Sequence, residues 1–401
     1  MLPFTVQPVL FDLMNSLRFF LAAAFALGST AFAQAPATRT EIQNAAQPQL
    51  TVGSDGRVWL VYGQAGPASV DHSAHAAGHG DGEKPKGKGH QPPGRSGDVF
   101  VTYSKDGGAT FAPAMKVAHL PKIMLGMRRG PRIAAHGDRL TVTVIADELI
   151  AFTSNDGGKT WGQPVTINEV STSAREGLHD LAGAPDGQAF VTWLDLRNGK
   201  MELWAASSKD GGRTWGKNQQ VYKSPDKSVC ECCHPSALYD EEGNLAVMWR
   251  NSIEGSRDMW MTTRAKGATA FSTARKIGEG TWKLNACPMD GGKILALGGG
   301  HFGAVWMRNG EVFISRGDSP EINLGQGKQP VAVHTGNAPP MVFWQKGADL
   351  VALHSLHGAE PVKQASDARF PSIVALPGGK GVLLAYERGA KDATSVAVDR
   401  L

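Results

Sequence analysis

The chain has 401 residues, with 41 Lys and Arg against 37 Asp and Glu, and a formal net charge of +4 at pH 7. This nearly balanced charge, without a basic block interleaved with aromatic residues, argues against a nucleic-acid-binding protein. The 49 glycines, the 10 tryptophans and short β-branched runs between Gly, Asn and Asp turns predict many short strands and almost no helix.

The N-terminus has the pattern of a secretory signal. Arg18 precedes an apolar run at 19–27, and the small residues of Ala31-Phe32-Ala33 follow, so we expect cleavage after Ala33. Residues 1–13, upstream of this signal, are expected to carry no fold. No later segment has the roughly 18 consecutive apolar residues of a membrane helix. The sequence therefore predicts a periplasmic or secreted protein without a membrane span.

An insertion rich in Gly, Lys, Pro and His occupies residues 64–97. It contains few apolar residues, so we expect it to stay unfolded in the absence of a ligand. Its H-x-x-H-x-x-x-H pattern is typical of segments that capture Cu(II), Ni(II) or Zn(II), and a solvated variable loop is the alternative. The four histidines are His72, His75, His79 and His90.

An eight-residue motif, S-x-D-G-G-x-T-[WF], starts at residues 104, 154 and 208, so its copies lie 50 and 54 residues apart. The Ser and Asp side chains can bond turn amides and the glycines allow positive φ, so each copy predicts a turn. The spacing is close to the period of a four-stranded propeller blade. The side chains that define the turns are those of Ser104, Asp106, Ser154, Asp156, Ser208 and Asp210.

A second, weaker repeat consists of an apolar strand, usually opened by proline, a Gly-rich hairpin turn and a strand that ends near an aromatic residue. Its seven copies cover residues 48–62, 131–144, 179–193, 235–249, 288–306, 330–344 and 371–386. The last copy has only about three strands before the C-terminus, so a strand near 40–42 is expected to complete its sheet. We predict an all-β fold, a single β-propeller over 34–401. Its four-stranded antiparallel blades number seven, with six as the alternative.

The three motifs resemble the Asp boxes, or bacterial neuraminidase repeats, of the sialidase superfamily, and the resemblance covers nearly the whole mature chain at the level of fold. It implies that ligands bind on the face where the innermost strand of each blade starts. The loop between the second and third strands returns to the same face, and the Asp boxes lie on the opposite one. Asp boxes occur in enzymes, receptors and scaffolds, so the resemblance by itself identifies only the scaffold.

All four cysteines fall on the ligand face in this register. Three lie in Cys230-Glu231-Cys232-Cys233-His234, just before one blade opens, and Cys287 lies just before the next blade. Thiolates are ligands of Cu(I) and Zn(II), so we predict a site that binds or handles copper or zinc. The candidate ligands are Cys230, Cys232, Cys233, His234, Cys287, Met124, Met127 and the four histidines of the insertion.

Two other interpretations of the cysteines stay open. An even number of cysteines in an exported chain often forms structural disulfides, although three cysteines within four residues are awkward partners for one another. A mixed case has one disulfide and a residual redox-active pair.

The resemblance also implies an enzymatic alternative, because sialidases clamp a substrate carboxylate with three arginines, protonate with an Asp and attack with a Tyr backed by a Glu. An exo-sialidase-type hydrolase of acidic glycans would use Asp195 as its acid, with Tyr386 and Glu387 in the other roles. These last two are neighbours and would point to opposite faces of a strand. The candidate anion-binding residues are Arg132, Arg197, Arg250, Arg308 and Arg388. A third alternative is a non-catalytic interaction scaffold, and we expect a monomer.

Overall fold

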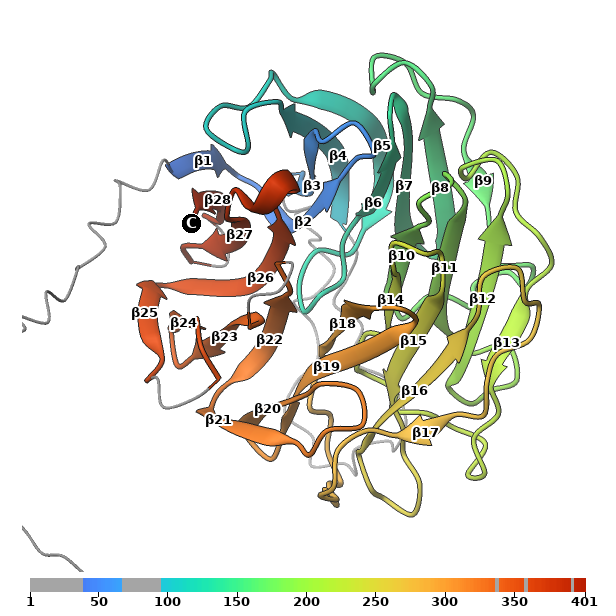
Figure 1. Cartoon of the computed structure of the whole chain (residues 1–401). Coiled ribbons are helices and arrows are strands. Elements are labelled where there is room, and N and C mark those ends of the chain that lie inside the picture. The colour runs from blue at the N-terminus through green and yellow to red at the C-terminus, as the bar shows by residue number, and fades with distance from the viewer. Residues whose placement is uncertain (1–38, 67–94, 336–338, 357–359, 391–392) are drawn as a thin grey trace, which may run out of the picture. The chain divides into compact units, whose positions relative to one another are not determined.

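The computed structural model describes residues 39–66, 95–335, 339–356, 360–390 and 393–401. Within these ranges 28 strands form seven four-stranded antiparallel sheets around a common axis (Figure 1). The only helical element there is the 3₁₀ turn Pro377–Gly379, and none of these residues belongs to a helix long and apolar enough to cross a membrane. The predicted seven-bladed, all-β propeller is confirmed, and the six-bladed alternative is excluded.

Each of the first six blades uses four consecutive strands, counted outward from the axis. The strands of the first blade are β2 (Ala46–Val52), β3 (Val58–Ala65), β4 (Arg95–Ser104) and β5 (Met115–Ile123). Those of the second are β6 (Arg132–His136), β7 (Arg139–Ala146), β8 (Glu148–Ser154) and β9 (Val165–Thr166). Those of the third are β10 (His179–Gly183), β11 (Ala189–Asp195), β12 (Glu202–Ser208) and β13 (Gln219–Tyr222).

The same order continues in the next three blades. The strands of the fourth blade are β14 (Ser236–Tyr239), β15 (Leu245–Arg250), β16 (Met259–Arg264) and β17 (Arg275–Lys276). Those of the fifth are β18 (Lys293–Gly298), β19 (His301–Arg308), β20 (Glu311–Ser315) and β21 (Ile322–Gln326). Those of the sixth are β22 (Lys328–Val333), β23 (Met341–Lys346), β24 (Asp349–Leu353) and β25 (Val362–Ala365).

The seventh blade combines strands from both ends of the described chain. It consists of β26 (Ala368–Ala375), β27 (Val382–Arg388), β28 (Ser395–Arg400) and, outermost, β1 (Arg39–Gln43). The pairing of β1 with β28 confirms the predicted closing strand near 40–42. The innermost strands contact one another in sequence, and β26 contacts β2 again, so the ring is closed.

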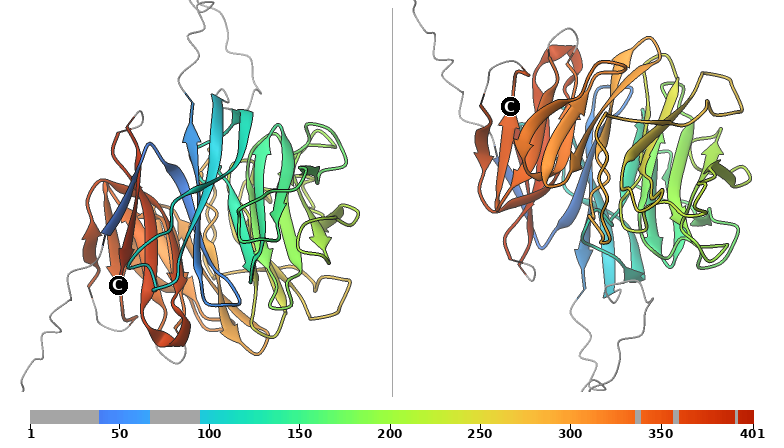
Figure 2. Two further views of the ribbon diagram at one scale, coloured as in Figure 1. Left: turned by 90° about the horizontal axis from the view of Figure 1, so that it is seen from above. Right: turned by 90° about the horizontal axis from the view of Figure 1, so that it is seen from below.

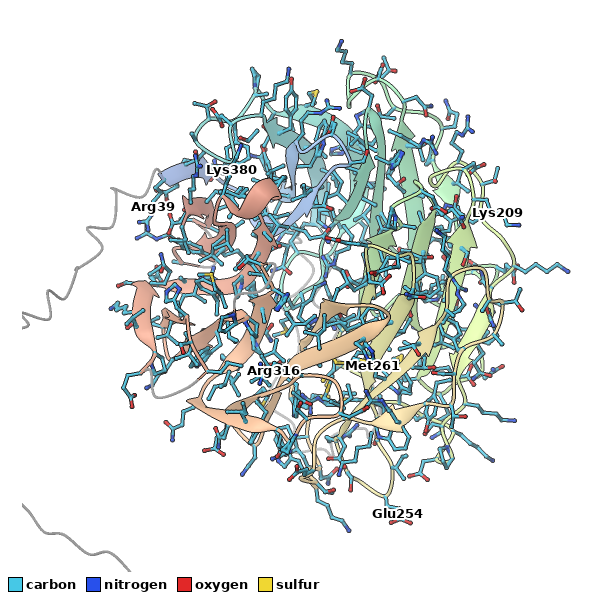
Figure 3. The ribbon with its side chains drawn as sticks, viewed as in Figure 1. Arg39, Lys209, Glu254, Met261, Arg316 and Lys380 are labelled. Carbon is cyan, nitrogen blue, oxygen red and sulfur yellow. The ribbon has the colours of Figure 1, made fainter. Side chains whose placement is uncertain are left out.

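Side chains of the second strands fill the spaces between blades. Trp193, Trp249, Trp306 and Trp344 are fully buried, and each lies near the end of the second strand of its blade. Burying one such ring contributes on the order of 2–3 kcal/mol. Met261, labelled in Figure 3, is buried in the apolar cluster between the fourth and fifth blades.

The Asp-box turns follow the third strands of three blades and share one pattern of hydrogen bonds. In the first turn, the Gly108 amide donates to Ser104 Oγ at 2.7 Å, and the Thr110 amide donates to Asp106 Oδ1 at 2.9 Å. The turns that start at 154 and 208 repeat these bonds. The residue types of the motif therefore form the turns that they predict.

The antiparallel order of the strands places the Asp-box turns and the cysteines on opposite faces. A box follows the C-terminal end of a third strand, on the face of the hairpin between first and second strands. The cysteines precede first strands, on the other face. Figure 2 shows the strands of each blade running between these two faces. We call the face on which the first strands start the upper face.

The Asp-box carboxylates make part of the fold's stability dependent on pH. Hydrogen bonds from Thr160 and Ser154 lower the pKa of Asp156 from 3.8 to about 2. A carboxyl group whose pKa is lower in the folded state contributes stability above its unfolded pKa. That contribution is lost as the pH falls through the folded pKa. The window for Asp156 therefore lies between about pH 4 and pH 2.

Asp156→Asn is expected to lower the midpoint of thermal unfolding at pH 7, because the amide is a weaker acceptor than the carboxylate. The difference from the parent should shrink between about pH 4 and pH 2, where the parent's carboxylate is also lost. Thermal unfolding followed by circular dichroism across this range measures it. Glu241→Gln, on an exposed hairpin turn outside the boxes, is the control. If the difference in unfolding midpoint between the variant and the parent stays constant down to pH 2, the Asp156 carboxylate is not the source of this pH-dependent stability.

Candidate functional site

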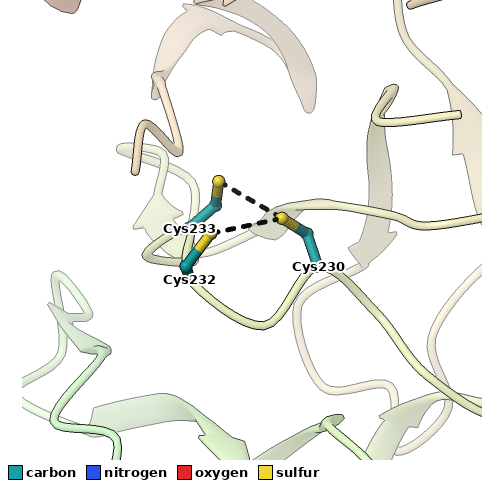
Figure 4. Close-up of side chains that lie close together, drawn as sticks. All are labelled: Cys230, Cys232 and Cys233. Atoms are coloured by element: carbon teal, nitrogen blue, oxygen red, sulfur yellow. Dashed lines mark hydrogen bonds between the residues drawn. The ribbon is translucent and has the colours of Figure 1, made fainter. Parts of the chain in front are cut away.

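Three cysteines lie together on the loop that leads into β14. The amide of Cys230 donates to the carbonyl of Arg250 at 3.0 Å, which fixes the loop to the end of β15. The Cys230, Cys232 and Cys233 side chains are only 0%, 7% and 1% exposed. The Sγ atom of Cys230 lies 3.9 Å from that of Cys232 and 3.4 Å from that of Cys233 (Figure 4). We call these three residues the thiol cluster.

The thiol cluster has the dimensions of a metal site. All three sulfur atoms lie within 4.8 Å of one another. Three sulfur ligands in a plane around a metal, each about 2.3 Å from it, would lie about 4.0 Å apart. Within the part of the chain that the structure describes, no other group of three or more His, Cys, Asp or Glu side chains could hold a metal ion.

The three thiols differ in acidity because each responds to the others. Hydrogen bonding to Cys232 and Cys233 lowers the pKa of Cys230 well below its usual value, and the charge of Arg250 acts in the same direction. Hydrogen bonding to Cys230 raises the pKa of Cys232, and burial raises that of Cys233. Cys230 is therefore the most acidic thiol of the cluster, and a bound metal ion would displace the protons of the ligands.

A thioether also adjoins the cluster, since Met289 packs against the three cysteines. His234, although next to Cys233 in sequence, is buried with its Nε2 3.2 Å from the carbonyl oxygen of Gly292. Cys287 is exposed and lies outside the group of three. The structure thus brings together three of the four cysteines and leaves His234 and Cys287 out of the group.

Neither of the two predicted methionine ligands is among the residues that pack against the thiol cluster. Met124 is buried, and Met127 is 49% exposed with its sulfur 3.8 Å from a nitrogen of Arg129. All four cysteines fall in the described residues, and all are free thiols. The four histidines of the insertion, His72, His75, His79 and His90, lie outside the described residues.

A second feature of the upper face is a pocket of about 80 Å³ on the axis, which has room for several water molecules. Charged side chains line one side of it, and apolar side chains of the first, sixth and seventh blades line the other. The titratable residues that line it are Arg128, Arg132, Asp180, His234 and Lys293. Lys293 was not singled out by any sequence pattern, because nothing in a strand's alternation shows that it faces the axis.

Arg128 ties the second blade to blades on the far side of the axis. Its guanidinium donates to the Gln329 side-chain oxygen at 2.7 Å and to the Pro371 carbonyl at 2.7 Å. Burial lowers the pKa of Arg128 to about 10, which still leaves it charged at neutral pH. The pocket is therefore bounded by a fixed cation.

The predicted catalytic residues are each bound to structural partners. Asp195 is buried and accepts hydrogen bonds from Ser173, Trp193 and Arg197. Burial alone would raise the pKa of Asp195, but these bonds outweigh it and hold the pKa below its usual value. The group is therefore ionised at neutral pH, which does not suit a proton donor.

Tyr386 and Glu387 point away from each other, as their adjacency in a strand predicts. The Tyr386 hydroxyl donates to Asp399 within its own sheet, whereas Glu387 accepts from the amide of Gln47 in the first blade. Burial raises the pKa of Tyr386. The two side chains therefore do not form a pair at one site.

The five predicted anion-binding arginines are not brought together. Arg197 pairs with Asp195, Arg308 with Glu321, and Arg388 lies 4.0 Å from Glu41. Arg250 donates only to main-chain carbonyls, and of the five only Arg132 lines the axial pocket.

Lys209 of the third Asp box is exposed at the outer edge of the third blade (Figure 3).

Comparisons with known proteins identify the fold. No family model matches the sequence, and no curated protein matches it. A Dyadobacter fermentans protein of unknown function has a TM-score of 0.52 and 14% identity, over 91% of this chain and 99% of that one. The protein YCF48, whose structure was solved with a bound D1 peptide, has a TM-score of 0.52 and 13% identity, over 91% of this chain and 97% of that one.

A trans-sialidase from Ruminococcus gnavus gives a TM-score of 0.42 at 13% identity, over 68% of this chain and 74% of that one. The likenesses to the Dyadobacter protein and to YCF48, at 14% and 13% identity, are likenesses of fold alone. The chain, whose strands form a seven-bladed β-propeller, is similar in fold to the Dyadobacter protein and to YCF48.

Proposed function

We propose that this chain is an exported protein that binds one Cu(I) ion through the thiolates of Cys230, Cys232 and Cys233. The observation that carries the proposal is the burial of three sulfur atoms within 4.8 Å of one another, in a group that contains no histidine and no carboxylate. A buried site of three thiolates suits the storage or transfer of a soft metal ion better than catalysis.

The donor set favours copper over zinc. Cu(I) prefers thiolate and thioether sulfur, and the thiol cluster offers three thiols with the thioether of Met289 packed against them. Structural zinc sites almost always have four ligands in a tetrahedron, drawn from Cys and His. Here the neighbouring His234 is held by the carbonyl of Gly292, on the side of the axial pocket.

The same structure gives less support to the hydrolase. The axial pocket has a volume of about 80 Å³, well below the roughly 300–1,000 Å³ that is typical of small-molecule sites. Asp195 is ionised and fully hydrogen-bonded, and Arg197 is committed to it. An interaction scaffold would not need three buried thiols on one loop, so the metal site is the function that the geometry supports best.

Titration of the reduced, metal-free protein with Cu(I) under anaerobic conditions, against a coloured Cu(I) chelator, tests the proposal. We expect one tightly bound equivalent. X-ray absorption at the copper edge should show a shell of sulfur atoms only. The absence of bound Cu(I), or a shell of nitrogen or oxygen ligands, would refute the site. Cell fractionation with N-terminal sequencing of the mature protein tests export.

A further inference from the structure

Arg250, the last residue of β15, is buried beside the thiol cluster and has only neutral hydrogen-bond partners. Its side chain is 1% exposed. Nε and Nη2 each donate to the carbonyl of Asp290 at 3.0 Å, Nη2 also donates to the carbonyl of Met307 at 2.7 Å, and Nη1 donates to the carbonyl of Arg257 at 2.7 Å. A guanidinium that bonds only to carbonyls keeps its full positive charge without a carboxylate partner.

The same residue is attached to both segments that form the site. Its own carbonyl accepts the amide of Cys230 at 3.0 Å, at the start of the cysteine loop. Its guanidinium holds the carbonyl of Asp290, the residue after Met289, which packs against the thiol cluster. The positive charge of Arg250 acts in the same direction as the hydrogen bonds that lower the pKa of Cys230, and at Cys233 it opposes the rise in pKa that burial causes. Arg250 is therefore a fixed cation next to the metal ligands.

The charge of the occupied site depends on the metal. Three thiolates around Cu(I) carry a net charge of −2, whereas three thiolates around Zn(II) carry −1. This difference of one charge holds whatever the protonation of the metal-free thiols. Buried charge is costly without a neighbouring charge of opposite sign, so a fixed cation stabilises the doubly negative complex more than the singly negative one.

We propose that Arg250 is the counter-charge of the thiol cluster and the residue that makes the site selective for Cu(I) over Zn(II). This inference rests on the proposed function and adds a specificity-determining residue to it. Arg250 is a positioning residue, because it acts on the thiolates and does not touch the metal ion. It differs from Arg308, the last residue of the corresponding strand in the next blade, whose charge is neutralised by Glu321.

The test is the ratio of the affinities for Cu(I) and Zn(II), each measured against a chelator on the reduced protein. Arg250→Met and Arg250→Gln remove the charge and should lower this ratio about tenfold or more, since the two complexes differ by one charge. Arg250→Lys keeps the charge and should keep the ratio within about twofold, even if both affinities fall. Arg308→Met, a matched change at the equivalent strand end, should leave both affinities unchanged.

A second pair of variants leaves Arg250 in place. The Trp282 ring centre lies 5.6 Å from the Arg250 guanidinium carbon, and this tryptophan is only partly buried. Trp282→Glu puts a carboxylate beside the guanidinium and should lower the Cu(I) to Zn(II) ratio severalfold. Trp282→Gln, of equal size but neutral, should not. If the neutral Arg250 variants do not fold, the two Trp282 variants still test whether the charge of Arg250 sets the Cu(I) to Zn(II) ratio.

The outcomes separate the two proposals. A ratio that stays at the parent value in the neutral Arg250 variants, or in Trp282→Glu, shows that Arg250 only anchors the loops and overturns the inference, while the copper site stands. A ratio that falls equally in Arg250→Lys and Arg250→Met also overturns it. A parent protein that binds no Cu(I) at the cysteines overturns both proposals.

Discussion

Replacing Cys230, Cys232 or Cys233 with serine should each weaken Cu(I) binding on the order of a thousandfold. A hydroxyl is a harder and much poorer donor to Cu(I) than a thiolate, no further His, Cys, Asp or Glu side chain belongs to the group, and the adjoining Met289 offers only a neutral thioether. The propeller should remain folded, because one buried hydroxyl costs only about 1–3 kcal/mol. Competition with a Cu(I) chelator measures the affinity, and circular dichroism checks the fold.

Cys287→Ser is the matched control. Cys287 is exposed and outside the group of three, so its substitution should leave both stoichiometry and affinity unchanged. If it weakens binding as much as the other substitutions, the fourth cysteine belongs to the ligand set.

The thiol count separates the site from the disulfide alternative. The metal-free protein, purified anaerobically without added reductant, should show four free thiols, as in the structure. Two structural disulfides would instead leave no free thiol without reduction, and losing one would cost about 2–4 kcal/mol of stability.

Asp399→Ala should produce the largest loss of stability among single substitutions in the closing blade, about 3 kcal/mol. The carboxylate of Asp399 is buried. It accepts two hydrogen bonds from Arg39 on β1, at 2.7 and 2.9 Å, and one from the hydroxyl of Tyr386 at 2.8 Å. Its removal leaves the buried hydroxyl unpaired and detaches the outermost strand from its anchor. Urea unfolding measures the change.

Two further substitutions measure how much of the stability lost in Asp399→Ala comes from each partner of the carboxylate. Tyr386→Phe removes one hydrogen bond and should cost about 1 kcal/mol. Arg39→Met leaves the buried Asp399 carboxylate without its cation and should cost about 1–3 kcal/mol, a cost that is reduced because the Arg39 side chain, labelled in Figure 3, is itself 40% exposed to solvent. If Asp399→Ala costs no more than Tyr386→Phe, the strand closure does not depend on this carboxylate.

The sequence was sufficient for the fold because the repeats are local. Each Asp-box turn is formed by bonds among residues at most four positions apart, so its residue types are visible in a short window. The opening prolines and the aromatic ends of the second strands mark the blades in the same way. The closing strand followed from counting, since the last blade had only three strands near the C-terminus and needed a fourth, which β1 supplies.

The sequence also placed the cysteines on one face, because the order of antiparallel strands decides which loops share a face. It could not decide which of them meet. Cys287 and the thiol cluster open neighbouring blades at similar positions, yet only Met289, two residues further along, packs against the cluster. The spacing of residues in the sequence predicts the face on which a loop lies, but it does not predict which side chains of that loop contact a neighbouring loop.

The partners of the charged residues were decided only by the tertiary structure. Arg197, Arg250 and Arg308 occupy similar strand ends, but the first and third are paired with carboxylates and Arg250 is not. Asp195 lies only two residues from Arg197, but Glu321 and the carbonyl of Asp290 come from other loops, and no periodicity in the chain encodes them. The sequence by itself thus determined the seven blades, their closure and the face that carries the thiols. The packing of blades 4 and 5 decided that Met289 and the guanidinium of Arg250 adjoin the thiols, because the contacts of these two residues join segments up to 57 residues apart.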